Sequence, residues 1–271
     1  MRRLLIRPGA IGDTILCLPA MESLRADYLE VWAPSAVVPL IRFADRARGI
    51  SSTGLDRVGI GVEPPARTLD ALSGFDDIVS WYGANRSEFR ESVKRLPFRF
   101  YPALPSGGER MHAADYFLRQ VGGHGPAIPR IACPPLEEHS DFAVIHPFSG
   151  SARKNWPLQR FREVAARLPF PVRWCAGPEE ALEDAVRFDD LYELGRWLAS
   201  ARVYIGNDSG ITHLAAAVGT PVIALFGPTD PAVWGPRGEC VRILCGTLET
   251  ISVDAVIESA CHLTKHGVPR P

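Results

Sequence analysis

The sequence predicts an α/β protein made of two Rossmann-like domains, each with a parallel sheet covered by helices. A short apolar strand, a glycine-rich loop and a helix follow one another near the amino terminus, and the same order returns after residue 142. Residues 122–140 lie between these repeats and carry glycines, four prolines and charge, which is typical of an interdomain linker. We therefore expect domains at 1–135 and 136–271 that face each other across a cleft.

Composition limits the classes of protein to consider. The 271 residues are 46% hydrophobic, which is enough for two cores of ordinary domain size. The 30 basic residues are balanced by 31 acidic ones, so the net charge does not favour a nucleic-acid partner. The six cysteines form no CxxC pair, and Cys17, Cys175 and Cys245 sit in apolar runs. We expect reduced and buried thiols, no metal and no cofactor.

The amino terminus carries two arginines but becomes polar and glycine-rich too early for a signal peptide. No apolar run reaches the length that spans a membrane. The sequence therefore predicts a cytoplasmic protein.

In the first half, apolar runs predict strands and helices in alternation. Strands are expected at 4–6, 29–32 and 77–81, and helices at 14–25, 37–47 and 112–121. Strands that alternate with helices in this way form a parallel sheet with covering helices. Pro19 conflicts with an uninterrupted first helix, because a proline inside a helix costs about 3 kcal/mol. The sequence therefore predicts a kink or a late start for that helix.

Gly12 and Asp13 lie in the glycine loop before this first helix. An aspartate in such a position most often caps the helix. A carboxylate at the carboxyl end of the first strand of an open α/β sheet also lies where these sheets bind ligands. Both interpretations of Asp13 stay open on this pattern alone.

A further helix is predicted over 85–96, with a cationic stripe along one face. Three cations recur every four residues on that face: Arg86, Arg90 and Lys94. Like charges at this spacing repel one another mildly, so an anionic ligand is one interpretation of the stripe. A solvated helix face is the other.

The second half repeats the alternation of strands and helices. Strands are expected at 142–146, 171–176, 203–205 and 221–226, and helices at 158–168, 191–201, 210–218 and 252–263. After the first of these strands, Lys154 lies in a loop where a point charge suits phosphate, and Ser149 and Gly150 offer hydroxyl and amide donors. After the next strand, Glu179 or Glu180 is placed to accept hydrogen bonds from ribose hydroxyls. A solvated loop lysine and an exposed helix-start glutamate are the structural alternatives.

The most informative stretch is GNDSGITHLAAAVGTPVIALFGPTDP, at 206–231. Oxygen-bearing side chains at Asn207, Asp208 and Ser209 come directly before a helix and cap its start. Free amides at Ser209 and Gly210 and the positive end of the helix dipole favour an anion such as a diphosphate. His213 lies one turn further on and either contacts that anion or packs in the core.

Three segments carry a resemblance to a known family: GAIGDTILCLPA, SGSARKNWP and NDSGITHLAAAVGTPVIALFGPTDP. In this order and spacing they resemble the lipopolysaccharide heptosyltransferases, which are the family-nine glycosyltransferases with the twin-Rossmann GT-B architecture. The resemblance implies an inverting sugar transfer from a nucleotide-diphosphate donor, typically ADP-heptose, to a growing lipopolysaccharide core, without a required metal. It implies a cytoplasmic enzyme, with peripheral contact at the cytoplasmic face of the inner membrane.

The resemblance also assigns roles to residues. Asp13 matches the proposed catalytic base and Lys154 the diphosphate lysine, and we take both as catalytic residues. The donor pocket is matched by Ser149, Gly150, Lys154, Glu179, Asp208, Ser209, Gly210 and His213. We assign the acceptor to the first domain, with Gly12 and the three cations as its contacts. The chain is short for the family, and TILCLPA follows Asp13 where many relatives carry a histidine, so donor and acceptor identities stay open.

Two other classes of function fit the same pattern. A nucleotide-sugar epimerase or hydrolase would bind the donor without transferring the sugar to an acceptor hydroxyl. A binding protein without catalysis would hold the nucleotide sugar only, although Asp13 together with Lys154 disfavours it. A P-loop NTPase is disfavoured because the sequence contains no GxxxxGK[ST] motif.

Overall fold

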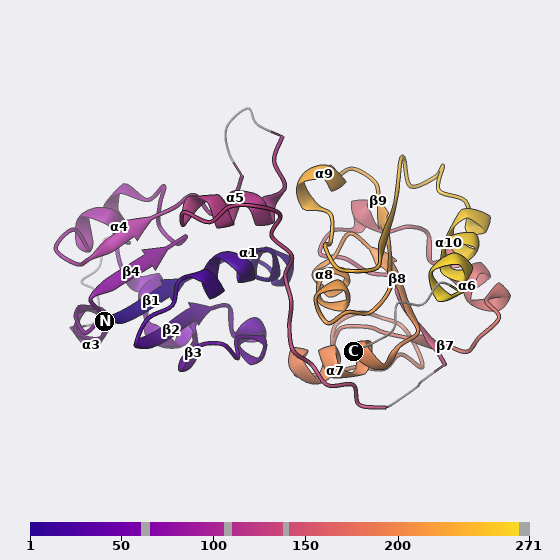
Figure 1. Cartoon of the computed structure of the whole chain (residues 1–271), viewed down its shortest axis with the longest axis horizontal. Coiled ribbons are helices and arrows are strands. Elements are labelled where there is room, and N and C mark those ends of the chain that lie inside the picture. The colour runs from indigo at the N-terminus through magenta and orange to yellow at the C-terminus, as the bar shows by residue number, and fades with distance from the viewer. Residues whose placement is uncertain (61–65, 106–109, 138–140, 266–271) are drawn as a thin grey trace. The chain divides into compact units, whose positions relative to one another are not determined.

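The computed structural model describes residues 1–60, 66–105, 110–137 and 141–265. The chain divides into two compact units, Met1–Ala127 and Ile128–Pro271 (Figure 1). This division precedes the expected boundary between 135 and 136, because the backbone after Ala127 pairs with the second unit. The Ile131 amide donates to the Ala217 carbonyl at 2.9 Å, and the Leu136 amide donates to the Arg196 carbonyl at 3.2 Å. The last part of the expected linker, 138–140, lies outside the described residues.

The first unit contains a five-stranded parallel sheet in the order β3-β2-β1-β4-β5. Its strands are β1 (Arg2–Ile6), β2 (Tyr28–Ala33), β3 (Arg46–Gly49), β4 (Asp77–Ser80) and β5 (Phe98–Phe100). Its helices are α1 (Ile11–Ser23), α2 (Ile50–Thr53), α3 (Ala66–Ser73), α4 (Ser87–Ser92) and α5 (Ala113–Gln120), with 3₁₀ turns η1 (Ser35–Leu40) and η2 (Leu55–Arg57). Helices α1 and α5 pack against each other, as Figure 1 shows.

The second unit contains another five-stranded parallel sheet, in the order β10-β9-β8-β6-β7. Its strands are β6 (Ala143–His146), β7 (Val172–Trp174), β8 (Val203–Asn207), β9 (Val222–Phe226) and β10 (Val241–Cys245). Its helices are α6 (Leu158–Arg167), α7 (Leu191–Ser200), α8 (Gly210–Ala217), α9 (Pro231–Trp234) and α10 (Val253–Lys265), with the 3₁₀ turn η3 (Ala152–Lys154). Helices α6 and α10 lie side by side (Figure 1).

In each sheet, the chain adds strands first on one side of its initial strand and then on the other side. In the first sheet the chain builds outward from β1 to β3 and then returns to place β4 on the other side of β1. In the second sheet β7 and β8 lie on opposite sides of β6. Open α/β sheets bind their ligands outside the carboxyl ends of the strands at such a reversal. The loops that follow β1 and β4, and those that follow β6 and β8, are therefore where a site is expected.

Both units bury a core of their own. Trp32 and Phe89 lie in the first cluster, and Trp156 and Phe161 lie in the second. Burying a large aromatic or aliphatic side chain contributes about 1.5–3 kcal/mol, so each cluster holds its sheet and helices together. Trp156 is 1% exposed and packs in the core of the second unit.

The predicted strands at 4–6, 29–32 and 77–81 are present as β1, β2 and β4. The helix predicted over 37–47 is wrong, because this segment forms η1 and then β3. Strand β3, with the sequence RARG, alternates arginine with small residues and pairs with β2 at the edge of the sheet. The first helix begins at Ile11 and continues through Pro19, so the late start is also wrong.

Two of the three cysteines expected inside are buried. Cys17 and Cys175 are enclosed, whereas Cys245 is exposed. The difference follows from position, because β10 is an edge strand and one of its faces meets solvent. In the part of the chain that the structure describes, each helix is too short or too polar to cross a lipid bilayer.

Candidate functional site

Lys154 and Asp208 meet at the carboxyl edge of the second sheet. Lys154 ends η3 in the loop after β6, and Asp208 directly follows β8. The Lys154 ammonium lies 2.7 Å from Asp208 Oδ2, with 33% of the lysine side chain exposed and only 8% of the aspartate. An ammonium has three donors, so this contact leaves Lys154 able to bind a second anion on its open side. The loops that carry the pair follow the two strands at the reversal of the sheet.

Helix α8 begins beside this pair. Ser209 is its N-cap, and its Oγ accepts a hydrogen bond from the Thr212 amide at 3.3 Å. Asp208 and Ser209 are both buried, and Gly210, the first residue of the helix, is half-buried. The predicted cap is therefore confirmed. The first turn of α8 carries the amides and dipole that favour an anion, next to the Lys154 ammonium.

Asn207 holds the loop that carries Lys154. Its Nδ2 donates to the Pro147 carbonyl at 2.8 Å, and its Oδ1 accepts from the Trp156 amide at 3.0 Å. These contacts lie at the two ends of the loop, and the Asn207 side chain is fully buried. The sequence indicated only a helix cap here, whereas the structure makes Asn207 a brace that fixes the Lys154 loop onto β8.

Ser149 lies within the same loop. Its hydroxyl donates toward Asn155 Oδ1 at 2.7 Å and the Ser151 carbonyl at 2.8 Å. These contacts shape the turn that leads to Lys154. Gly150 is exposed, and a Cβ placed there would meet nothing within 4 Å. The structure therefore brings Ser149 into the loop network and leaves Gly150 open to solvent.

Of Glu179 and Glu180, which follow β7, only Glu180 is hydrogen-bonded to described residues at the carboxyl edge of the second sheet. Glu179 is exposed. Glu180 Oε2 lies 3.0 Å from His146 Nε2 and accepts from the Gly177 amide at 2.6 Å. Burial works to raise the pKa of Glu180, but the hydrogen bonds from His146 and the Gly177 amide outweigh it, so its pKa lies below the ordinary value.

His213 and Thr212 lie in the buried first turns of α8. His213 is 6% exposed, and its backbone amide donates to the Ser209 carbonyl at 3.3 Å. Thr212 Oγ1 lies 3.1 Å from the hydroxyl of Tyr204, and burial raises the pKa of that phenol. These buried residues pack in the interior at the start of α8.

In the first unit, Asp13 lies at the carboxyl edge, in the first turn of α1. Asp13 Oδ2 accepts a hydrogen bond from the Ala10 amide at 2.8 Å, so the carboxylate reaches back to the residue that precedes the helix. Gly12 stands beside it in the same turn and is half-buried. Gly9 has φ +112, and a Cβ there would lie 2.7 Å from Asp13 Oδ2. Only glycine fits this close approach, so the loop is shaped around the Asp13 carboxylate.

Arg7 is a neighbour of Asp13 that sequence reasoning missed. It is 1% exposed, and its guanidinium donates to the Asp13 carbonyl at 3.1 Å from Nη2 and to the Ala103 carbonyl at 3.0 Å from Nη1. It also lies over the Phe117 ring, 4.5 Å from the centroid. An arginine that ends a strand just before the glycine loop was the available signal. Cys17 follows one turn after Asp13, and burial raises the pKa of its thiol to about 12, so it stays protonated.

The predicted cationic stripe on one helix is not formed. Helix α4 covers only Ser87–Ser92, so Arg86 precedes it and Lys94 follows it. Arg86 Nη1 donates to the Tyr82 hydroxyl at 2.7 Å, and the Arg90 guanidinium lies 5.3 Å from the Phe100 ring centroid. Lys94 is paired with Glu91. The helix ends at Ser92, and Val93 and Leu96 after it pack in the core of the first unit.

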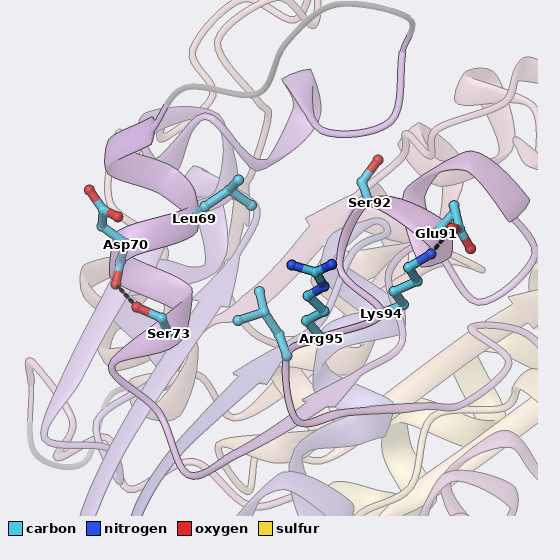
Figure 2. A pocket seen from close by; sticks show the side chains of 8 residues that line it. Leu69, Asp70, Ser73, Glu91, Ser92, Lys94 and Arg95 are labelled. Atoms are coloured by element: carbon cyan, nitrogen blue, oxygen red, sulfur yellow. Dashed lines mark hydrogen bonds and ion pairs between the residues drawn. The ribbon is translucent and has the colours of Figure 1, made fainter.

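An open depression of about 440 Å³ lies elsewhere on the first unit. Figure 2 shows its side chains coming from α3 on one side and from the end of α4 on the other. The lining residues are Leu69, Asp70, Ser73, Glu91, Ser92, Lys94, Arg95 and Leu96. These segments lead into the amino ends of β4 and β5, so the depression lies at the edge opposite to the one where such sheets bind ligands. It is therefore separate from the site built around Asp13.

Comparison with known proteins gives the same family as the motifs. Residues 189–260 match the model of glycosyltransferase family 9 (heptosyltransferase). Lipopolysaccharide heptosyltransferase 1 of Salmonella typhimurium is 32% identical over 114 residues, which cover 36% of each protein. Lipopolysaccharide heptosyltransferase 3 of Escherichia coli K12 is 54% identical over 119 residues, covering 36% of this chain and 34% of the relative. The chain thus matches about a third of the length of these relatives.

Solved structures resemble the chain over almost its whole length. An ADP-heptose lipopolysaccharide heptosyltransferase II from Escherichia coli has a TM-score of 0.75 at 16% identity, covering 98% of this chain and 99% of its own. A second heptosyltransferase from Escherichia coli, solved with ADP, has a TM-score of 0.71 at 17% identity, covering 95% and 98%. At these identities the likeness shows the fold. The two parallel-sheet units have the GT-B fold of these structures, and the matches above bear out the predicted resemblance to family nine over part of the chain.

Proposed function

We propose that the chain is an inverting glycosyltransferase that moves a sugar from a nucleotide-diphosphate donor to a hydroxyl of a lipopolysaccharide core or related glycan. A heptose carried by ADP is the proposed donor, because the relatives are named heptosyltransferases and one was solved with ADP. The acceptor is assigned to the first unit and the donor to the second. The observation that carries the proposal is the contact of Lys154 and Asp208 beside the N-terminus of α8.

This contact suits the leaving group of such a reaction. As the sugar departs, the bond between C1 and the diphosphate oxygen breaks and negative charge grows on the nucleoside diphosphate. The Lys154 ammonium and the backbone amide of Gly210 are fixed beforehand and would bind that charge. Asp208 holds the lysine in place, and its own charge is balanced by the same contact. A diphosphate that leaves as a stabilised anion needs no separate general acid.

Asp13 is the proposed general base. The acceptor oxygen would attack C1 of the sugar while its proton passes to the Asp13 carboxylate. The Ala10 amide donates a hydrogen bond to one oxygen of that carboxylate, and the Arg7 guanidinium donates one to the Asp13 backbone carbonyl. A base held at both points is oriented before the acceptor arrives, which is what proton transfer in the transition state requires.

Glu180 is a better candidate than Glu179 for the ribose hydroxyls. Its carboxylate is ionised and fixed at the carboxyl end of the strand next to β6, whereas Glu179 lies in solvent. An ionised and oriented acceptor can discriminate a diol from a single hydroxyl, while a mobile surface side chain adds little. The other proposed donor contacts are Ser149, Gly150, Ser209 and His213, around the same edge.

The lipid-linked nature of the proposed acceptor places the reaction at the cytoplasmic surface of the inner membrane, with the protein in peripheral contact. Gly12 remains a proposed acceptor contact beside Asp13. Arg86, Arg90 and Lys94 remain proposed acceptor contacts as separate cations rather than one stripe, and Lys94, which lines the depression at the opposite edge of the sheet, would bind a part of the acceptor away from Asp13. Carboxylates and phosphates of a lipopolysaccharide core would pair with these three cations.

A donor with a labelled sugar tests the proposal. The purified chain is incubated with labelled ADP-heptose, with and without a heptose-free lipopolysaccharide core, and the products are separated. We expect label in the core and release of ADP that depends on the acceptor. Equal release of free sugar without acceptor would identify a hydrolase, and conversion to an isomeric donor would identify an epimerase. Bound donor that never turns over would identify a binding protein.

A further inference from the structure

We infer that His146 is a positioning residue that fixes the Glu180 carboxylate to receive a ribose diol. This inference rests on the proposed function, because it concerns the ribose of the nucleotide donor. His146 is the last residue of β6, opposite Gly206 of β8 in the parallel pairing. It therefore lies at the reversal of the second sheet, on the strand that leads into the Lys154 loop. No motif in the sequence singled it out.

The geometry around Glu180 is asymmetric. Both of its described side-chain hydrogen bonds fall on Oε2, from His146 Nε2 at 3.0 Å and from the Gly177 amide at 2.6 Å. Oε1 receives no hydrogen bond from any described residue, and the side chain is 27% exposed. Two donors on one oxygen fix the plane of the carboxylate and leave the other oxygen to a ligand.

The protonation of the pair follows from the same contacts. The pKa of Glu180 lies below its ordinary value, because the hydrogen bonds from His146 and Gly177 outweigh the effect of burial. The carboxylate is therefore ionised and can only accept. His146 Nε2 must then carry the proton, which assigns the tautomer from the network. The remaining ring nitrogen, Nδ1, is buried and contacts no described polar group.

His146 itself is held rigidly. Only 3% of it is exposed, and its ring lies 6.1 Å from the Phe148 ring in an edge-to-face arrangement. A rigid donor costs little entropy when it orients its acceptor, since the side chain is already fixed in the fold. The backbone of Glu180 is held as well, because Arg187 Nη2 donates to its carbonyl at 2.8 Å. These contacts fix Glu180 through Oε2 and its backbone carbonyl, and they leave Oε1 open to a ligand.

A carboxylate oxygen of this kind suits vicinal hydroxyls. The ribose of a nucleoside diphosphate offers two adjacent O–H donors, and an ionised acceptor binds such donors more strongly than a neutral one. A hydrogen bond to a charged group corresponds to roughly tenfold or more in affinity. We expect the wild-type protein to bind ADP at least about tenfold more tightly than an analogue that lacks the 2′ or the 3′ hydroxyl.

The test measures dissociation constants for four ligands by calorimetry: ADP, 2′-deoxy-ADP, 3′-deoxy-ADP and inorganic pyrophosphate. The variants are His146→Ala, His146→Gln and Glu180→Gln, with His124→Ala as the matched control, since His124 is an exposed histidine of the first unit. His146→Ala is expected to weaken ADP about fivefold to tenfold and to leave pyrophosphate unchanged, because the phosphate contacts are separate. Discrimination against the deoxy analogues should shrink accordingly. His146→Gln keeps an N–H donor and should restore part of the loss.

The outcomes distinguish a failure of this inference from a failure of the proposed function. Wild-type protein that binds neither ADP nor pyrophosphate would remove the proposed function, and this inference with it. Wild-type protein that binds ADP, with unchanged discrimination in His146→Ala, would overturn the inference and leave the function standing. Equal weakening of all four ligands, with a lower Tm, would make His146 a purely structural residue and overturn it too. If His146→Ala does not fold, His146→Gln and Glu180→Gln decide the question by the same comparison.

Discussion

The loop edges of the two sheets differ in how they hold their charged groups. In the second unit, Lys154 and Asp208 come from two loops and lie 2.7 Å apart beside the N-cap Ser209, and Asn207 braces one loop against the other strand. In the first unit, Asp13 is held by its own helix and by Arg7, while the predicted acceptor cations lie apart. We propose that the second edge is a prebuilt anion site. The first edge has one oriented carboxylate.

This difference fits the two substrates of the proposed reaction. A diphosphate is the same in every donor, so a rigid site made by a helix start and a lysine can bind it with little adjustment. A glycan acceptor is large and varied, and the invariant requirement is a base beside one hydroxyl. The comparison therefore predicts that changes at the second edge act on donor affinity, and that changes at the first edge act on turnover.

Asp13→Asn should have the largest effect. The amide keeps an oxygen that can accept from Ala10, so the start of α1 should survive, but it cannot take a proton. We expect kcat to fall about 10²-fold or more, with donor affinity nearly unchanged. Initial rates with labelled donor and calorimetry with ADP measure the two quantities, with the exposed Asp70→Asn as control. Turnover within a few-fold of wild type would leave Asp13 as a helix cap only.

Lys154→Ala should come next. Losing one charge-assisted phosphate contact costs roughly 1.5–3 kcal/mol, and Asp208 would be left buried without its cation. We expect weaker ADP binding by about tenfold to a hundredfold, measured by calorimetry. Arg153→Ala is the matched control, because Arg153 is the exposed neighbour in the same 3₁₀ turn. If both variants bind ADP as the wild type does, Lys154 is not part of the site.

Asn207→Ala should act through the loop rather than the charge. It removes a buried side chain that satisfies the Pro147 carbonyl and the Trp156 amide. An unsatisfied buried polar group costs about 1–3 kcal/mol, so the free energy of unfolding should fall by at least that much. Urea unfolding measures it, with the exposed Asn85→Ala as control. A loss of ADP affinity without any loss of stability would show that Asn207 touches the ligand instead.

The smallest effect is expected from the separate cations. Changing Arg86, Arg90 and Lys94 together to glutamine removes charges that are exposed or already engaged, and exposed ion pairs contribute about 0–1 kcal/mol. We expect the KM for acceptor to rise only about twofold to fivefold and the salt dependence of the rate to flatten. Part of the change should appear as lower stability, because Arg86 loses its bond to Tyr82. Unchanged acceptor kinetics across a salt series would remove these residues from the acceptor site.

Local patterns explain which parts of the fold were predictable. The buried strands β1, β6, β8 and β9 are short apolar runs next to glycine loops, and the cap at Ser209 depends on neighbours in sequence. Such features are fixed by a few adjacent residues. The edge strands β3, β5 and β10 were missed or mistaken because none of their residues is fully buried and each strand is interrupted by arginine.

Contacts between distant segments explain what was missed in the site. Glu180 and Glu179 are neighbours in sequence, and only the contact with His146, across two strands, distinguishes them. Arg7 is positioned by its hydrogen bond to the Ala103 carbonyl and its contact with the Phe117 ring, and both residues are distant from it in sequence. The cationic stripe was wrong because α4 ends at Ser92, before Lys94, where propensity alone would have continued the helix.

The most direct measurement of the central claim is amide hydrogen exchange of the whole chain with and without saturating ADP. The account predicts slower exchange in two segments of the second unit: the loop at 147–157 and the first turn of α8 at 209–213. Exchange in the depression between α3 and α4, at 69–73 and 91–96, should not change. If calorimetry shows that ADP binds, and the protection falls on that depression or misses both second-unit segments, the donor site has been placed on the wrong part of the molecule.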